Sequence, residues 1–248
     1  MHEIVSKQND IYLREIQSEL RDRRGIEVSI SSLCRTLKRK KLVPKKTLIS
    51  SEQSSERVKE LRYEFRSWLD QVDVRNLIFI DETGINLAMA RRYGRGERGK
   101  RVYDDRPGNK GKNVTLIGAM SDEGLIATMT LTGGLDTEAF LVFIEQRLLP
   151  ALWVGAIVVM DNLPVHYANA ARASIESVGA LVKFLPPYSP DLSPIELCWS
   201  KLKEILRSAK ARTSDVLDTT ISAAIDLITE DNALSWFHHC GLVLEPIR

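Results

Sequence analysis

The sequence has only three cysteines among its 248 residues, and it has no long hydrophobic run. Cys34, Cys198 and Cys240 are far apart and odd in number, which disfavours a disulfide framework or a zinc site and predicts reduced thiols. The longest apolar run, residues 148–160, contains a proline and a glycine and is too short for a membrane span. The first residues lack the pattern of a signal peptide. We therefore expect a cytoplasmic protein, associated with the nucleoid when it binds DNA.

Net charge is also small, at +2, but it is unevenly distributed. Residues 1–50 contain 12 Lys and Arg against 6 Asp and Glu, and residues 91–112 contain 9 against 3. The rest of the chain is therefore net negative. Two basic segments in an otherwise acidic chain indicate two contacts with a polyanion, and chance clustering of surface charge is the alternative.

Two apolar runs, residues 77–81 and 156–161, each end in a carboxylate, Asp81 and Asp161. Each run is typical of a short buried strand with an acid at its C-terminal end. In open α/β sheets this end is where sites are built, and an unpaired carboxylate is too costly to bury in the core. An ordinary acid in a turn is the alternative for either run alone.

A third acid, Glu196, follows a proline-rich stretch over residues 185–196. Four prolines restrict its backbone, so the loop can hold a side chain in a set place. Taken alone, the stretch also fits a helix start in which Ser193 is the N-cap and Glu196 only completes a capping box. Asp191, in the same stretch, is a weaker rival to Glu196.

Three converging carboxylates would repel one another, and a divalent cation relieves that repulsion. Hard oxygen ligands suit Mg²⁺ or Mn²⁺, and a pair of such ions supports phosphoryl transfer. The residues that we predict as both catalytic and metal-binding are Asp81, Asp161 and Glu196.

Three motifs carry a resemblance to a known family: Asp81-Glu82-Thr83, Asp161-Asn162 with His166, and residues 188–196 followed by Trp199. Together they resemble a DDE transposase of the Tc/mariner superfamily, in its bacterial insertion-sequence branch. The 34 residues between Asp161 and Glu196 match the spacing of that superfamily. The resemblance runs from about Ile11 to the C-terminus. It departs at Ser193, where the family usually has Asn, and both residues are good N-caps.

The resemblance implies an enzyme that cuts transposon ends by metal-assisted hydrolysis and joins the 3′-hydroxyl to target DNA, at TA. It implies two Mg²⁺ or Mn²⁺ ions in each active site and no nucleotide cofactor. Its partners would be double-stranded DNA, as transposon ends and target, and a second copy of the chain in a homodimer. Two alternatives are a catalytically silent DNA-binding remnant or regulator and a general RNase H-like nuclease.

The fold that the resemblance implies is an RNase H-like α/β core with a mixed five-stranded sheet and flanking helices. Its first and fourth strands would be adjacent, which brings Asp81 near Asp161. Because side chains alternate along a strand, Glu82 should point away from Asp81, and we expect that it is not a ligand. Asn162 either holds a phosphate oxygen or fixes the loop. His166 either touches the DNA backbone or orients Asp161, and an ordinary loop hydrogen bond is the alternative for both.

Local patterns predict the other core elements. Residues 113–120 and 125–131 predict a hairpin. Residues 136–149 predict a helix capped by Asp136, and residues 168–177 and 181–184 predict a further helix and strand.

The N-terminal basic segment predicts two helices, over residues 12–20 and 28–40, with Gly25 between them and Ser29 as an N-cap. Leu33 and Leu37 face inward, together with Cys34. A short apolar helix, a turn and a basic helix resemble a helix-turn-helix, of winged-helix type. Its expected DNA-binding residues are Ser31, Ser32, Arg35, Lys38 and Arg39. Family members usually carry a further such module before it, so we expect that another reading frame supplies it or that it has been lost.

The second basic segment formally contains G-x-G-x-x-G over residues 94–99. No strand directly precedes it and no helical pattern follows it, so we reject a dinucleotide site. A flexible Arg-rich loop is better suited to a phosphate backbone, and in the family this insertion contacts DNA or a second protomer. A solvated hairpin is the alternative. The expected DNA-binding residues are Arg91, Arg92, Arg95, Arg98, Lys100 and Arg101.

These patterns divide the chain into four predicted segments. They are a DNA-binding segment at 1–48, a linker and packing helix at 49–75, an RNase H-like DDE catalytic domain at 76–212, and a helical tail at 213–248.

Overall fold

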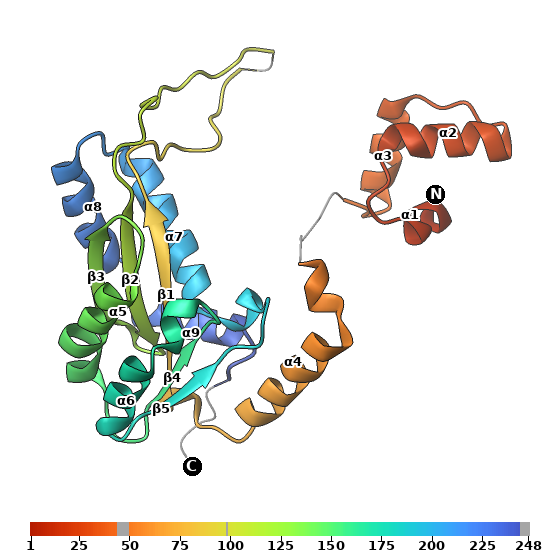
Figure 1. Ribbon diagram of the computed structural model, residues 1–248. Helices are drawn as coiled ribbons and strands as arrows, with labels where there is room; N and C mark the ends of the chain where they lie inside the picture. The colour runs from red at the N-terminus through yellow and green to blue at the C-terminus, as the bar shows by residue number, and fades with distance from the viewer. Residues whose placement is uncertain (44–49, 98, 244–248) are drawn as a thin grey trace. The chain divides into compact units, whose positions relative to one another are not determined.

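The structure is a computed structural model that describes residues 1–43, 50–97 and 99–243 (Figure 1). The chain divides into two compact units, Met1–Ser50 and Ser51–Arg248. Residues 44–49, at the boundary between the predicted DNA-binding segment and the predicted linker, lie outside the described residues, as do Arg98 and the last five residues of the predicted tail. Within the described ranges, no helix is long and apolar enough to cross a membrane.

As far as it is described, the first unit consists of three helices: α1 (His2–Lys7), α2 (Leu13–Arg24) and α3 (Ile30–Arg39). Leu20 of α2 packs with Leu33 and Leu37 of α3 in a small apolar core. The Ser29 hydroxyl accepts a hydrogen bond of 3.2 Å from the Ser32 N–H, which confirms the predicted N-cap. Gly25 ends α2 with a positive φ of 62°, a conformation that glycine adopts at little cost.

The second unit is built on one mixed sheet of five strands: β1 (Leu77–Ile85), β2 (Val114–Ser121), β3 (Gly124–Thr132), β4 (Ile157–Met160) and β5 (Leu181–Phe184). The strand order is β3-β2-β1-β4-β5. β1 is antiparallel to β2 and parallel to β4, and β4 is parallel to β5. The RNase H-like arrangement and the predicted neighbours β1 and β4 are therefore confirmed.

Helices cover both faces of this sheet (Figure 1). One face packs against α4 (Glu56–Leu69), α7 (Ile195–Ala209), α8 (Ser214–Asp226) and α9 (Glu230–His239). The other face packs against α5 (Thr137–Phe143), the π-helical turn Ile144–Leu148 that continues it, and α6 (Asn169–Ser177). Asp136 caps α5 as predicted, through a bond of 2.8 Å from the Ala139 N–H.

Burial on both faces explains why residues 77–80 are apolar without interruption. Leu77 and Phe79 lie in the core on the α7 face, and Ile78 and Ile80 lie in the core on the α5 face. All four side chains are almost completely buried, and successive side chains in a strand point to opposite faces.

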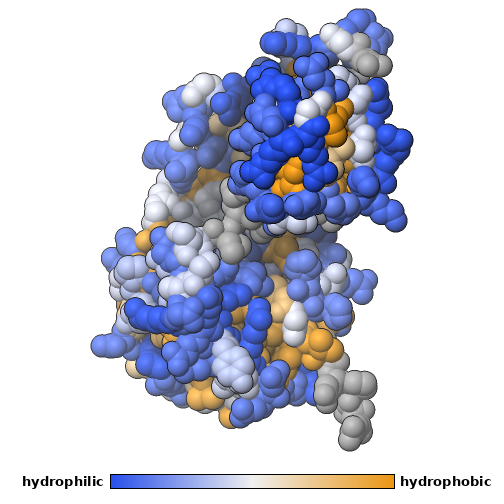
Figure 2. All heavy atoms as spheres, turned by 90° about the vertical axis from the view of Figure 1, so that its right-hand side faces the viewer, coloured by the Kyte–Doolittle hydropathy of each residue, from blue (hydrophilic) through white to orange (hydrophobic). Residues whose placement is uncertain are grey.

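Hydrophilic side chains cover most of the surface that is visible in Figure 2, and apolar side chains show only in patches.

One prediction about the strands was wrong. β1 does not end at Asp81 but continues to Ile85, because β2 pairs with it as far as Ile85. The parallel pairing of β1 with β4 stops at Ile80 and Met160. Asp81 therefore lies inside β1, at the point where the neighbouring strand ends and the sheet opens on one side.

Candidate active site

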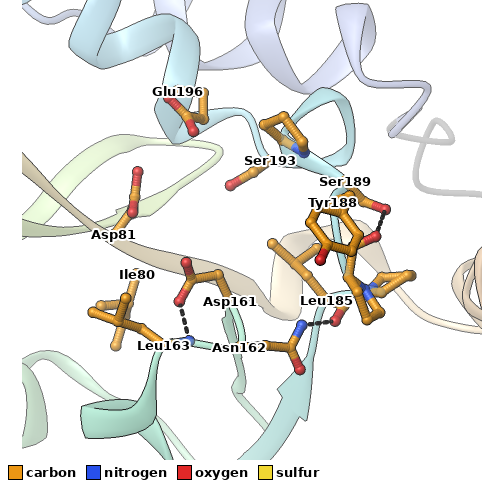
Figure 3. A pocket seen from close by; sticks show the side chains of 13 residues that line it. Ile80, Asp81, Asp161, Asn162, Leu163, Leu185, Tyr188, Ser189, Ser193 and Glu196 are labelled. Carbon is orange, nitrogen blue, oxygen red and sulfur yellow. Dashed lines mark hydrogen bonds between the residues drawn. The ribbon is translucent and has the colours of Figure 1, made fainter. Parts of the chain in front are cut away.

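Three carboxylates, those of Asp81, Asp161 and Glu196, line one pocket of about 370 Å³ in the second unit (Figure 3). They come from the middle of β1, from the residue after β4 and from the first turn of α7. Figure 3 shows the carboxylates around the pocket, with the proline-rich loop on its other side. The structure therefore brings together the three acids that the sequence singles out.

Asp81 is held by α7. The indole Nε1 of Trp199 donates a hydrogen bond of 2.9 Å to its Oδ2. Burial raises the pKa of the Asp81 carboxyl to about 7, and the negative charges of Glu196 and Glu82 add to the shift. The sequence singles out Trp199 only as the residue that follows the third motif, so its role as a hydrogen-bond donor was not predicted.

Asp161 is held by the loop that follows β4. Its Oδ1 lies 2.7 Å from Nδ1 of His166 and accepts a bond of 2.9 Å from the Leu163 N–H. Burial opposes ionisation of Asp161, but these two contacts outweigh it, and its pKa is lowered. The His166 side chain is completely buried and packs against Phe140, with ring centroids 4.8 Å apart. This placement supports an orienting role for His166 and leaves it no surface for a DNA backbone.

Asn162 fastens the same loop to the end of β5. Its Nδ2 donates a hydrogen bond of 2.7 Å to the carbonyl of Leu185, and the Tyr167 hydroxyl donates to its Oδ1. The Tyr167 ring in turn stacks on Phe184, with centroids 4.4 Å apart. These contacts support the loop-fixing alternative for Asn162, although its side chain also lines the pocket.

Glu196 does not act as part of a capping box. α7 begins at Ile195 with Pro194 in the cap position and no side-chain cap. The Glu196 N–H bonds to the backbone carbonyl of Ser193 at 3.2 Å, so the Ser193 hydroxyl is not needed as its acceptor. The predicted Ser193 N-cap is therefore wrong. Burial raises the pKa of the Glu196 carboxyl, and Lys203 partly offsets that effect.

The proline-rich loop is tied to α4 by a contact that the sequence did not indicate. Arg62 donates two hydrogen bonds to the Asp191 carboxylate, at 2.9 and 2.6 Å. Gln53 donates a bond of 2.8 Å to the carbonyl of Tyr188, which has a positive φ of 56°. Asp191 is thus paired with Arg62 and does not line the carboxylate pocket. This favours Glu196 over Asp191 as the third acid of the site.

The donor chemistry of the pocket fits a divalent cation. All three acids offer hard oxygen atoms, and two of them have raised pKa values because they are buried beside other carboxylates. Within the described ranges, however, no three Asp, Glu, His or Cys side chains are already gathered closely enough to hold an ion. The carboxylates surround the pocket without closing on one point.

The predicted DNA-binding residues that the structure describes lie at the surface. In α3, Ser31, Arg35, Lys38 and Arg39 are exposed and Ser32 is half-buried, while Leu33 and Leu37 are buried. In the segment between β1 and β2, every predicted DNA-binding residue that the structure describes is exposed: Arg91, Arg92, Arg95, Lys100 and Arg101. This segment extends well away from the sheet (Figure 1).

The base of this extended segment is fastened to the end of α7. Arg212 donates to the carbonyls of Leu87, Met89 and Asp105, at 3.3, 3.2 and 3.1 Å. Lys210 pairs with Asp104 at 2.6 Å. The segment therefore projects from a fixed base, and those of its arginines that the structure describes are exposed to solvent.

The acidic pocket at the C-terminal end of β4, in an RNase H-like sheet, is therefore a candidate active site. Comparison with protein families agrees: the model of the DDE superfamily endonucleases matches residues 76–218. The chain therefore belongs to the DDE superfamily endonucleases. A search by sequence against curated proteins gave no match.

Solved structures of Mos1 transposase resemble the chain in fold. The paired-end complex with the left transposon end is 17% identical, covers 96% of this chain and 73% of that chain, and has a TM-score of 0.76. The Mos1 mariner paired-end complex with Mn is 19% identical over 96% and 74%, with a TM-score of 0.73. The catalytic domain of Mos1 mariner transposase is 17% identical over 80% and 92%, with a TM-score of 0.58.

Proposed function

We propose that the protein is a transposase of the Tc/mariner superfamily, in its bacterial insertion-sequence branch. It cuts the ends of its transposon and joins the freed 3′-hydroxyl to target DNA at TA. The observation that carries the proposal is the convergence of Asp81, Asp161 and Glu196 on one pocket in an RNase H-like fold. Membership of the DDE superfamily endonucleases and the likeness to Mos1 complexes with transposon ends support it.

The three carboxylates would hold two Mg²⁺ or Mn²⁺ ions, and the Mos1 complex with Mn supports that choice. Such ions, when bound, neutralise charge on the phosphate and activate the attacking oxygen. The protein's own part is positioning: Trp199 holds Asp81, His166 holds Asp161, and the proline-rich loop fixes the start of α7 near Glu196. Water attacks the phosphorus at the transposon end, and the 3′-oxygen of the transposon strand leaves as the 3′-hydroxyl. That hydroxyl then attacks a phosphorus of the target strand, whose own 3′-oxygen leaves, so no covalent protein intermediate is needed.

Two exposed basic surfaces are suited to the DNA partner. The outward face of α3 would read the transposon end, and the arginines between β1 and β2 would hold a phosphate backbone or a second protomer. The Mos1 paired-end complexes support a homodimer that bridges two ends. Arg98, which the structure does not describe, remains a predicted DNA-binding residue of the same basic segment.

The test is metal-dependent cutting of a labelled duplex that carries the element's own terminal inverted repeat. We expect cuts at the repeat boundary with Mg²⁺ or Mn²⁺, and none with chelator. Asp161→Ala should abolish cutting while it leaves DNA binding in place. Asp215→Ala, which removes an exposed carboxylate at the start of α8, is the matched control and should cut normally.

Other outcomes would separate the alternatives. Salt-sensitive binding without any cutting would favour a DNA-binding remnant, and adding back an upstream helix-turn-helix module would then test whether that module is required. Cutting of random duplex as readily as of the repeat would favour a general nuclease. Cutting that persists in all three single alanine variants of the acids would overturn the proposed site.

A further inference from the structure

Glu82 is the neighbour of Asp81 but belongs to the opposite face of the sheet. Asp81 contacts Trp199 on the α7 face, whereas Glu82 points toward the α5 face. There its Oε2 lies 3.7 Å from Nε2 of His166. Both atoms are buried, and neither has a hydrogen-bond partner among the described residues. Glu82 is also absent from the lining of the carboxylate pocket, which agrees with the expectation that it is not a ligand.

His166 therefore lies between two carboxylates. Its Nδ1 is 2.7 Å from Asp161 Oδ1, and its Nε2 faces Glu82. The ring is completely buried and rests against Phe140, so it has little freedom to turn. Glu82, His166 and Asp161 form a chain of three side chains that leads from the α5 face of the sheet to the pocket.

The donor and acceptor groups of these three side chains determine how they can hydrogen-bond to one another. A carboxylate accepts, so the Nδ1 atom beside Asp161 carries a proton and donates it. A hydrogen bond between Nε2 and the Glu82 carboxyl then requires one proton between the two atoms, because two unprotonated acceptors would repel each other. The distance of 3.7 Å is just beyond hydrogen-bond length, so a small movement closes the contact. Leaving both atoms buried without a partner is costly.

We propose that Glu82 is a positioning residue: acting through His166, it fixes the ring and thereby holds the Asp161 carboxylate in the pocket. The His166 and Leu163 contacts both use Oδ1 of Asp161, which leaves Oδ2 as the oxygen available to the pocket. An outer residue that fixes a histidine ring in this way sets the orientation of the inner group. The relevance of this role to catalysis rests on the proposed function, but the contact itself does not.

The test combines a spectroscopic and a binding measurement on the full chain. The sequence has only four histidines, so the ring of His166 can be followed by NMR after ¹⁵N labelling of histidine, with His166→Gln to assign it. Binding of Mn²⁺ is followed by electron paramagnetic resonance of the free ion. The variants are Glu82→Ala, Glu82→Gln and, as matched control, Glu123→Ala, which removes an exposed carboxylate from the β2–β3 turn.

We expect the wild-type ring to carry a proton on Nδ1 and Glu82→Ala to disturb that signal. The same variant should weaken Mn²⁺ binding about 10- to 100-fold. Glu82→Gln should restore most of the loss, because its amide can donate to Nε2. Glu123→Ala should match the wild type in both measurements.

A wild-type His166 ring with its proton only on Nε2 would overturn the proposal without any variant. A folded Glu82→Ala protein with an unchanged ring signal and unchanged Mn²⁺ affinity would also overturn it. Absence of DNA cutting by the wild type, with the ring signal and its response to Glu82→Ala as expected, would count against the transposase proposal and leave the positioning role supported.

Discussion

The indole N–H of Trp199 donates to Oδ2 of Asp81 across 118 residues of sequence, at 2.9 Å. Trp199 is 2% exposed, so its N–H needs a partner inside the protein, and the Asp81 carboxylate provides it. The bond links α7, which also carries Glu196, to the middle of β1. Asp81 is therefore fastened to the helix that carries Glu196.

Replacement of Trp199 by Phe tests this link. Phe keeps an apolar ring but removes the donor, so Asp81 loses the contact that orients its carboxylate. We expect DNA cutting to fall about 10- to 100-fold, and the free energy of unfolding to fall by about 1–3 kcal/mol. Trp236→Phe, on α9 and away from the pocket, is the control for loss of an indole. A Trp199→Phe protein that cuts at the wild-type rate would show that the bond is unimportant.

Gly118 makes room for the Trp199 ring. It pairs with Asp81 in the sheet, and a Cβ placed on it would lie 2.8 Å from the Trp199 ring. We expect Gly118→Ala to push the indole aside and to lower the free energy of unfolding by about 1–3 kcal/mol, measured by urea denaturation. Gly84→Ala in β1 is the matched control, because a Cβ there meets nothing within 4 Å. Equal stability of the two variants would contradict the packing argument.

The Arg62–Asp191 pair predicts a pH dependence of stability. The Arg62 guanidinium lowers the pKa of the Asp191 carboxyl, so the pair stabilises the folded state above the unfolded pKa of about 4 and loses that effect as pH falls through the folded pKa. Because Asp191 is 51% exposed, we expect Arg62→Leu to cost only about 1 kcal/mol at pH 7.

Urea denaturation of wild type and Arg62→Leu at neutral pH and near pH 3 measures this effect. The difference between the two proteins should shrink toward zero at the lower pH. Arg57→Leu, an exposed arginine of the same helix, should show little difference at either pH. A difference of equal size at both pH values would mean that packing of Arg62, and not its charge, is responsible.

Two of the thiols are shielded from water, Cys198 fully and Cys240 in part. Burial raises the pKa of the Cys198 thiol to about 12 and that of the Cys240 thiol to about 11. At pH 8 the reactive thiolate is then on the order of one part in ten thousand for Cys198. We expect iodoacetamide to leave both residues unmodified in the native protein and to modify both in urea, as read by mass spectrometry. Equal alkylation of Cys198 with and without urea would be incompatible with this burial. Cys34, Cys198 and Cys240 are all free thiols in the structure.

Asp81→Asn separates stability from activity. The amide keeps an acceptor for Trp199 but removes a buried negative charge that faces Glu196 and Asp161. We expect DNA cutting to be lost and the free energy of unfolding, measured in chelator at pH 8, to rise by about 1–2 kcal/mol. Mn²⁺ should then raise the melting temperature of the wild type more than that of the variant. A variant that is less stable than the wild type in chelator would contradict this reasoning.

The sequence by itself determined the parts of this protein that depend on local pattern. Continuous apolar runs before Asp81 and Asp161 predicted buried strands, because a strand covered on both faces needs apolar residues at every position. The prolines before Glu196 indicated a stiff loop that could hold this acid, and the family resemblance of the three motifs implied the class of fold. Ser29 and Asp136 were recognisable as helix caps because a cap acts on residues only a few positions away.

Only the tertiary structure decided how the acids are held. β1 continues past Asp81 because β2 supplies its hydrogen-bonding partners. Trp199, Arg62 and Glu82 reach their partners from distant segments, and no local pattern encodes such contacts. Ser193 does not cap α7 with its side chain, because its backbone carbonyl accepts the hydrogen bond from the Glu196 N–H. Contacts between side chains that are remote in the sequence depend on how the helices pack against the sheet, and only the tertiary structure determines that packing.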